Sequence, residues 1–186
     1  MDTNLKINRH YCRNMEKKEI QLRFDEKVKE LEETLPTMRE RVNCCELTLT
    51  NILQVLGVDD YKFHNLAMPL AGGFGGYKSK EGWQGACGAV TGGCAAIGVI
   101  MGGDMIMDLP TMNMAYLKAA KYASDFEKQF GTVICSGLCG YDFSTPEGMM
   151  DYMKNDTWAK ICNKFVIWAV DKIRKDYKRE LKKKWE

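Results

Sequence analysis

The stretch that decides the fold is GACGAVTGGCAAIGVIM, residues 85–101. It carries no charged residue and consists mainly of glycine, alanine and aliphatic side chains. Glycine is a poor helix former, less favourable than alanine by about 1 kcal/mol per residue. A helix of this composition is usually buried, because its missing side chains let other backbones approach closely. We therefore predict a buried glycine- and alanine-rich helix over residues 84–101.

Amphipathic helical patterns flank this stretch on both sides. Apolar residues recur at helical spacing over residues 14–34, 37–56, 60–71, 111–130 and 157–183. Pro36 ends the first pattern, and Gly57 is suited to cap the second. Thr145 before Pro146 is typical of the start of a further helix. Alternating β patterns are almost absent. We predict an all-α fold, a single-domain bundle of about six or seven helices.

Length and charge narrow the class of protein. The chain has 186 residues, with 27 lysines and arginines against 25 aspartates and glutamates, so its formal net charge is +2. The hydrophobic fraction of 45% excludes a disordered chain. Near-neutral charge argues against binding to nucleic acid, which usually needs a basic excess. We divide the chain into a charged helical N-terminal extension, residues 1–36, and a cysteine-containing helical domain, residues 37–186.

The sequence favours a soluble cytoplasmic protein that does not bind membranes. Residues 1–20 contain no apolar stretch of the kind found in secretory signals. Residues 82–103 are interrupted by too many glycines to make an attractive membrane-spanning helix. In a reducing compartment structural disulfides are rare, so grouped cysteines indicate metal ligands or redox thiols.

The cysteine content is high for a domain of this size. The eight cysteines are Cys12, Cys44, Cys45, Cys87, Cys94, Cys135, Cys139 and Cys162. No C-x-x-C motif occurs, so the spacing indicates neither a thioredoxin-like dithiol nor a zinc knuckle. Thiolates that converge from several segments could hold an iron–sulfur cluster or another soft metal. The alternative is that buried cysteines fill small spaces in the core.

A second glycine-rich run, AGGFGG at residues 71–76, is a candidate for cofactor binding. Its backbone N–H groups could hydrogen-bond to a phosphate, a thiolate or a cluster sulfide. The candidate cofactor-binding residues are Gly72, Gly73, Gly75 and Gly76. No phosphate-binding loop or dinucleotide motif surrounds them, and a tight turn between helices is the alternative interpretation. His64 is a candidate for metal binding or proton transfer, or else a packing residue.

Several segments resemble, in order, the redox-active C-GCAxxG-C-C family. These segments are NC at residues 43–44, GGFGG at 72–76, GACGAVTGG at 85–93, FGTVIC at 130–135 and ICNKFV at 161–166. The resemblance covers roughly residues 38–175. It implies a small, mostly helical protein, frequent in anaerobes, whose assumed role is redox or iron–sulfur chemistry. By position it places the family's metal-binding cysteines at Cys44, Cys87, Cys135 and Cys162.

The chain departs from the family pattern at two points. The central motif reads C-G-A-x-x-G, with Gly88 between Cys87 and the following alanine. Three additional cysteines, Cys45, Cys94 and Cys139, could be extra ligands, resolving thiols or packing residues. A related module occurs in split-Soret cytochromes, but this chain has no C-x-x-C-H, so covalent haem attachment is not supported.

Three hypotheses for the function follow. The first is an electron-transfer protein with an iron–sulfur cluster or another metal bound by cysteine thiolates, which needs a redox partner protein. The second is a thiol–disulfide enzyme or sensor, with Cys87 as the reactive thiolate near a helix N-terminus and a partner such as Cys94 or Cys135. The third is a binding module or subunit whose cysteines are structural. A homo-oligomer is compatible with all three, and whether the protein is an oxidoreductase is left open.

Overall fold

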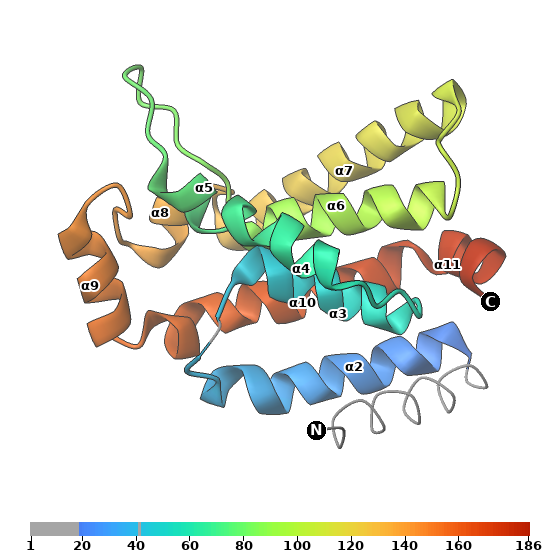
Figure 1. The fold of residues 1–186 in the computed structure, drawn as a ribbon, viewed down its shortest axis with the longest axis horizontal. Coiled ribbons are helices and arrows are strands. Elements are labelled where there is room, and N and C mark those ends of the chain that lie inside the picture. The colour runs from blue at the N-terminus through green and yellow to red at the C-terminus, as the bar shows by residue number, and fades with distance from the viewer. Residues whose placement is uncertain (1–18, 41) are drawn as a thin grey trace.

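The computed structural model describes residues 19–40 and 42–186. This part of the chain has ten α-helices, eight of them seven residues or longer, and no β-strand (Figure 1). The predicted all-α, single-domain fold is confirmed. Cys12 and the beginning of the first predicted helix lie outside the described residues.

The elements follow one another with short connections. The α-helices are α2 Ile20–Thr34, α3 Cys44–Val55, α4 Tyr61–Ala67, α5 Gly72–Gly76, α6 Gly88–Gly102, α7 Leu109–Phe130, α8 Cys135–Cys139, α9 Pro146–Lys154, α10 Asn163–Asp176 and α11 Lys178–Trp185. Two short 3-10 turns are η1 Leu35–Thr37 and η2 Met68–Leu70, and a π-helical turn, η3, spans Trp158–Cys162.

Helix α6 lies at the centre and packs against α3, α7 and α10. Its glycines are points of close contact. A Cβ on Gly92 would lie 2.6 Å from the backbone oxygen of Cys45, and one on Gly93 would lie 2.3 Å from the ring of Tyr122. The buried glycine-rich helix is therefore present as predicted, although it begins at Gly88 rather than at residue 84.

The late start of α6 has a structural cause. Residues 85–87 are extended and pair with the connection between α7 and α8. The N–H of Cys87 donates to the oxygen of Val133 at 2.8 Å, and the N–H of Cys135 donates to the oxygen of Gly85 at 3.1 Å. This antiparallel contact holds two cysteine-bearing segments side by side.

Helix α2 belongs to the same core as the other helices. Its apolar face packs against α10 and α3, and its residues Ile20, Phe24 and Leu31 are almost fully buried. Arg174 of α10 forms an ion pair with Asp25 of α2. The charged N-terminal pattern thus contributes one well-packed helix to the domain.

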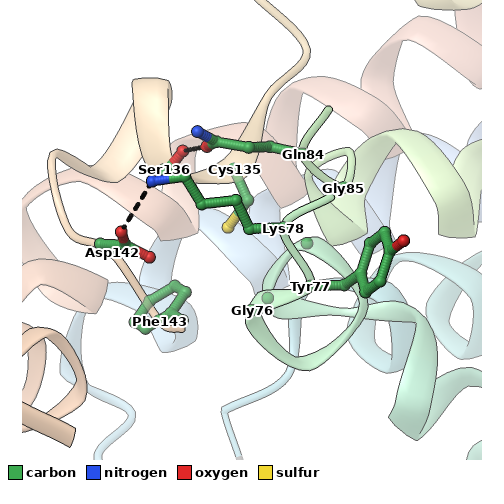
Figure 2. Close-up of a pocket in the computed structure, with 11 residues that line it drawn as sticks. Gly76, Tyr77, Lys78, Gln84, Gly85, Cys135, Ser136, Asp142 and Phe143 are labelled. Carbon is green, nitrogen blue, oxygen red and sulfur yellow. Dashed lines mark hydrogen bonds and ion pairs between the residues drawn. The ribbon is translucent and has the colours of Figure 1, made fainter. Parts of the chain in front are cut away.

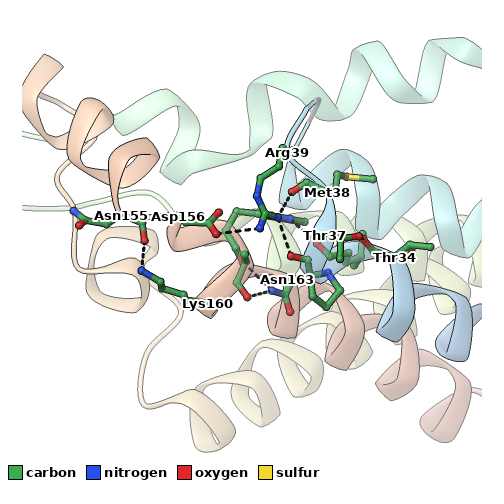
Figure 3. Close-up of polar contacts among 12 residues, drawn as sticks. Thr34, Thr37, Met38, Arg39, Asn155, Asp156, Lys160 and Asn163 are labelled. Atoms are coloured by element: carbon green, nitrogen blue, oxygen red, sulfur yellow. Dashed lines mark hydrogen bonds and ion pairs between the residues drawn. The ribbon is translucent and has the colours of Figure 1, made fainter.

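A polar clamp joins the segment before α3 to the segment before α10 (Figure 3). Arg39 forms an ion pair with Asp156 at 3.1 Å and donates to the backbone oxygen of Pro36 at 2.9 Å. The indole N–H of Trp158 donates to the oxygen of Leu35 at 2.9 Å. Because these two segments lead into the first residue of α3 and into η3, the clamp sets the distance between two cysteine-bearing elements.

The sequence predicts one continuous helix over residues 157–183, and this prediction is wrong because the segment is broken at two points. Its first turn is the wider η3, where the side-chain amide of Asn163 donates to the backbone oxygens of Trp158 and Ala159. The chain breaks again at Tyr177, whose hydroxyl donates to the oxygen of Lys118 at 3.3 Å. Burial of the Tyr177 ring requires this bend, which periodicity does not reveal. Because of such breaks, and because α5 and α8 are additional short helices, the described part of the chain has more than the predicted six or seven helices.

None of the helices among the described residues is both long enough and apolar enough to cross a membrane.

Two glycines of α6 provide a matched test of the packing. Gly93→Ala should lower the free energy of unfolding by about 1–3 kcal/mol, because its methyl group would overlap the buried ring of Tyr122. A Cβ on Gly98 would meet no atom of another element within 4 Å, so Gly98→Ala should raise stability by about 0.5–1 kcal/mol through helix propensity alone. Urea unfolding measures both, and equal effects of the two substitutions would contradict this packing.

Candidate functional site

Five cysteines gather where the ends of several helices meet, near α5 and α8 in Figure 1. Each occupies a helix terminus. Cys44 is the first residue of α3, Cys87 is the N-cap of α6, Cys135 and Cys139 begin and end α8, and Cys162 ends η3. Helix ends converge here because α3, α6 and α8 all start at this side of the bundle.

The thiols contact one another in two groups. Cys44 hydrogen-bonds to both Cys162 and Cys87, and Cys135 hydrogen-bonds to Cys139. The two groups also interact electrostatically, because the charges of Cys87 and of Cys162 contribute to raising the pKa of Cys135. Cys87, Cys139 and Cys162 are each at most 5% exposed. The cluster is therefore a largely water-shielded set of sulfur atoms.

In the first group, hydrogen bonds shift the pKa values of Cys44 and Cys87 in opposite directions. The bond from Cys44 lowers the pKa of Cys87, and the N–H groups of Ala89 and Val90 at the start of α6 favour the same thiolate. The pKa of Cys44 is raised well above its ordinary value by its bonds to Cys162 and Cys87 and by burial. The same contact thus lowers the pKa of Cys87 and raises that of Cys44.

The second group repeats this arrangement inside α8. The hydrogen bond from Cys135 lowers the pKa of Cys139 to about 7. The same bond, together with burial, raises the pKa of Cys135. The four-residue spacing of these two cysteines, visible in the sequence, places both sulfurs on one side of this short helix.

Glycines permit the cysteine-bearing segments to come this close. A Cβ on Gly88 would lie 2.6 Å from the nitrogen of Cys45 and 2.9 Å from the Cβ of Cys44. A Cβ on Gly73 would lie 3.3 Å from the Cβ of Cys135. A side chain at either glycine would push these backbones apart and separate the thiols.

The glycine run at residues 71–76 forms an unusual left-handed turn. All five residues of α5 have positive φ, from +60° at Phe74 to +85° at Gly76. A left-handed helix costs non-glycine residues roughly 1–2 kcal/mol each, so four glycines limit this strain to Phe74. The tight turn proposed as an alternative from the sequence is therefore present with reversed handedness, and it places Gly72 and Gly75 at the cysteine site.

An open cavity of about 240 Å³ adjoins the thiols. Cys44, Cys135 and Cys162 line it together with Gly72 and Gly75 of α5. Its remaining wall is mainly apolar and comprises Val42, Met68, Ala71, Phe143 and Met149, with Asn43 and Tyr152 as polar members. The cavity gives a small group direct access to sulfur atoms from three different elements.

Tyr152 of α9 contacts this cluster. Its hydroxyl hydrogen-bonds to Cys162, and burial, followed by the charges of nearby cysteines, raises its pKa. The phenol therefore stays protonated and donates to the sulfur. No motif in the sequence signals this residue, because α9 is placed over the cavity only by the tertiary structure.

A hairpin formed by residues 77–85 covers Cys135 (Figure 2). Lys78 and Gln84 pair across it. Lys78 forms an ion pair with Asp142 at 3.4 Å, and the hydroxyl of Ser136 donates to Gln84. These contacts attach the hairpin to α8 and to the connection that follows it.

The other candidate residues lie apart from this cluster. Cys45 contacts Thr91, and burial raises its pKa. Cys94 packs toward α7, 4.0 Å from the oxygen of Ala119, and burial raises its pKa to about 11. Of the three additional cysteines, Cys139 is the one that joins the four positions implied by the resemblance.

His64 is engaged elsewhere, with its Nδ1 2.6 Å from a carboxylate oxygen of Glu46. No group of three or more histidine, cysteine, aspartate or glutamate side chains within residues 19–40 and 42–186 has the arrangement of a metal-binding site. None of the seven cysteines in that part of the chain forms a disulfide. The clustered cysteines instead shift one another's pKa values.

Comparison with known proteins identifies the group to which this arrangement belongs. A family model described as "Putative redox-active protein (C_GCAxxG_C_C)" matches residues 42–175, which is well over half of the chain. No curated protein and no solved structure matches the sequence. The matched region contains all five clustered cysteines, the left-handed glycine turn and Tyr152. The resemblance seen in the sequence is confirmed, and the chain belongs to the C_GCAxxG_C_C family of putative redox-active proteins.

Proposed function

We propose that this protein transfers electrons through an iron–sulfur cluster held by its clustered cysteines. The observation that carries the proposal is the convergence of five cysteines from four separate segments, three of which, Cys44, Cys135 and Cys162, line one cavity. Cysteines that merely fill core space need no adjoining cavity, whereas cysteine thiolates are the standard ligands of iron–sulfur clusters. The chemistry of the donor set therefore fits this cofactor.

Each residue has a distinct role in this proposal. Cys44, Cys87, Cys135 and Cys162 are the ligands, since they occupy the family positions and lie on four different segments. The thiols must lose their protons to bind metal, and the start of α6 stabilises negative charge on Cys87. A cluster bound here would supply one-electron oxidation and reduction.

The surroundings favour such a site. Apolar residues such as Met68 and Phe143 form most of the wall beside the cysteines, and Tyr152 donates a hydrogen bond to a ligand sulfur. We further propose that a redox partner protein exchanges electrons with this site, and that the protein works in a reducing compartment such as the cytoplasm.

Metal analysis tests the ligand set. Protein purified without oxygen should contain iron and acid-labile sulfide and should absorb visible light. Cys44→Ser, Cys87→Ser and Cys162→Ser should each reduce the iron content at least tenfold, because each removes one thiolate ligand. Cys94→Ala should keep the wild-type content, since Cys94 packs against α7. Colourless, metal-free wild-type protein would overturn the proposal.

Tyr152 should affect the reduction potential of the bound cluster without contributing to its binding. Tyr152→Phe removes a hydrogen bond to a sulfur, so the more negative reduced state loses stabilisation. The reduction potential should fall by tens of millivolts at unchanged iron content, as measured by redox titration. Tyr61→Phe is a matched control, because Tyr61 is 71% exposed on α4. An unchanged reduction potential in Tyr152→Phe would show that the Tyr152 hydroxyl does not affect the cluster.

Thiol–disulfide exchange is the second candidate, favoured by the hydrogen bond from Cys135 that lowers the pKa of Cys139 to about 7. In this reaction the two thiols would lose two electrons and two protons to a small-molecule disulfide. That molecule would become two thiols while one S–S bond forms in the protein.

Peptide mapping of metal-free protein distinguishes the two candidates. After treatment with oxidised glutathione, a thiol-exchange protein should contain a Cys135–Cys139 or Cys44–Cys87 disulfide that dithiothreitol reverses. Cys45 and Cys94 should remain unpaired and serve as internal controls, because burial keeps both protonated. Absence of any reversible pair would exclude this second function.

A further inference from the structure

Helix α7 buries few of its residues against the rest of the described chain, given its length. It spans 22 residues, yet its buried residues are only Ala115, Tyr122 and Phe126, and it packs mainly against α6. Helices in proteins gain most of their stability from packing an apolar face. The first half of α7 has little such packing within the described part of this chain.

The uncovered side of this half is apolar. No charged residue occurs between Asp108 and Lys118. The exposed large side chains of this patch are Met105 at 81%, Ile106 at 100%, Leu109 at 64%, Met114 at 47%, Tyr116 at 64% and Leu117 at 67%. A contiguous exposed apolar patch usually marks an interaction site. Figure 1 shows that this end of α7 lies away from α8 and α9, and so away from the cysteines.

The patch is large enough to be an interface by itself. Its exposed fractions correspond to roughly 800 Å², which is the area that each partner contributes to a standard-size interface. We propose that this patch, residues 105–120, is the interface of a homodimer in which two copies of α7 pack antiparallel.

The distribution of charge favours a second copy as the partner. Asp104 and Asp108 lie at the N-terminal end of the patch, and Lys118 and Lys121 lie at its C-terminal end. In an antiparallel pair the acidic end of each copy lies beside the basic end of the other, whereas a parallel pair would bring like charges together. Both lysines form ion pairs within their own chain, Lys118 with Glu180 and Lys121 with Asp125, but the Lys121 side chain is 66% exposed and can also attract an aspartate of the second copy.

The helical spacing also fits a two-fold axis that passes near Asn113. With this axis, Leu109 lies at the level of Leu117 of the second copy. The centre of the interface would then contain Asn113 opposite its own copy, where two side-chain amides can hydrogen-bond to each other.

Sedimentation of the full chain tests this dimer. The wild-type protein should sediment as a dimer at micromolar concentration, and Leu117→Lys should weaken the dimer by more than about tenfold. Gln129→Lys, which adds the same charge to an exposed position of α7 outside the patch, should leave it intact. Far-ultraviolet circular dichroism of each variant reports whether it remains folded. A monomeric wild type, or an unchanged Leu117→Lys dimer, would overturn the proposal.

Cross-linking tests the antiparallel register. Asn113→Cys should form an intermolecular disulfide between the two copies of residue 113, identified by peptide mapping under mild oxidation. Gln129→Cys, about 24 Å further along the helix, should form none. A dimer that links through residue 129 but not through residue 113 would overturn the register.

Discussion

The close approach of backbones at the N-terminus of α6 is the constraint on which the site depends. Gly88 and Gly92 let α6 lie directly against the first turn of α3, and Gly73 lets the left-handed turn lie against α8. These contacts leave no room for a methyl group. The cysteines of these segments meet because the chain carries glycine where their backbones cross.

This proximity changes the chemistry of the sulfur atoms. Separate buried thiols would all have raised pKa values, as Cys45 and Cys94 have. Beside Cys135, Cys139 instead has a pKa lowered to about 7, while the pKa of Cys135 is raised. The start of α6 adds N–H groups that face negative charge on Cys87. Burial without these partners would have produced inert packing residues.

Much of the fold could be predicted from local patterns, since amphipathic periodicity and caps depend on neighbouring residues. The cap predicted at Thr145 is present, and Asn43 and Asp108 cap their helices in the same way, each accepting a backbone N–H from three residues ahead. Breaks in helices were not predictable in the same way. The bend at Tyr177 and the π-turn before Asn163 arise from contacts with Lys118 and from a side-chain amide inside the turn, which hydropathy does not encode.

The sequence by itself determined that this chain is helical, that its central helix is rich in glycine, and that its cysteines occur at four family-like positions. The first two properties follow from composition and local spacing, and the third follows from the resemblance to the family. The tertiary structure alone decided that Cys139 joins the cluster while Cys45 and Cys94 do not, and that Tyr152 reaches Cys162. Membership in the cluster depends on which helix ends meet in space, because a thiol acts on another only within a few ångströms.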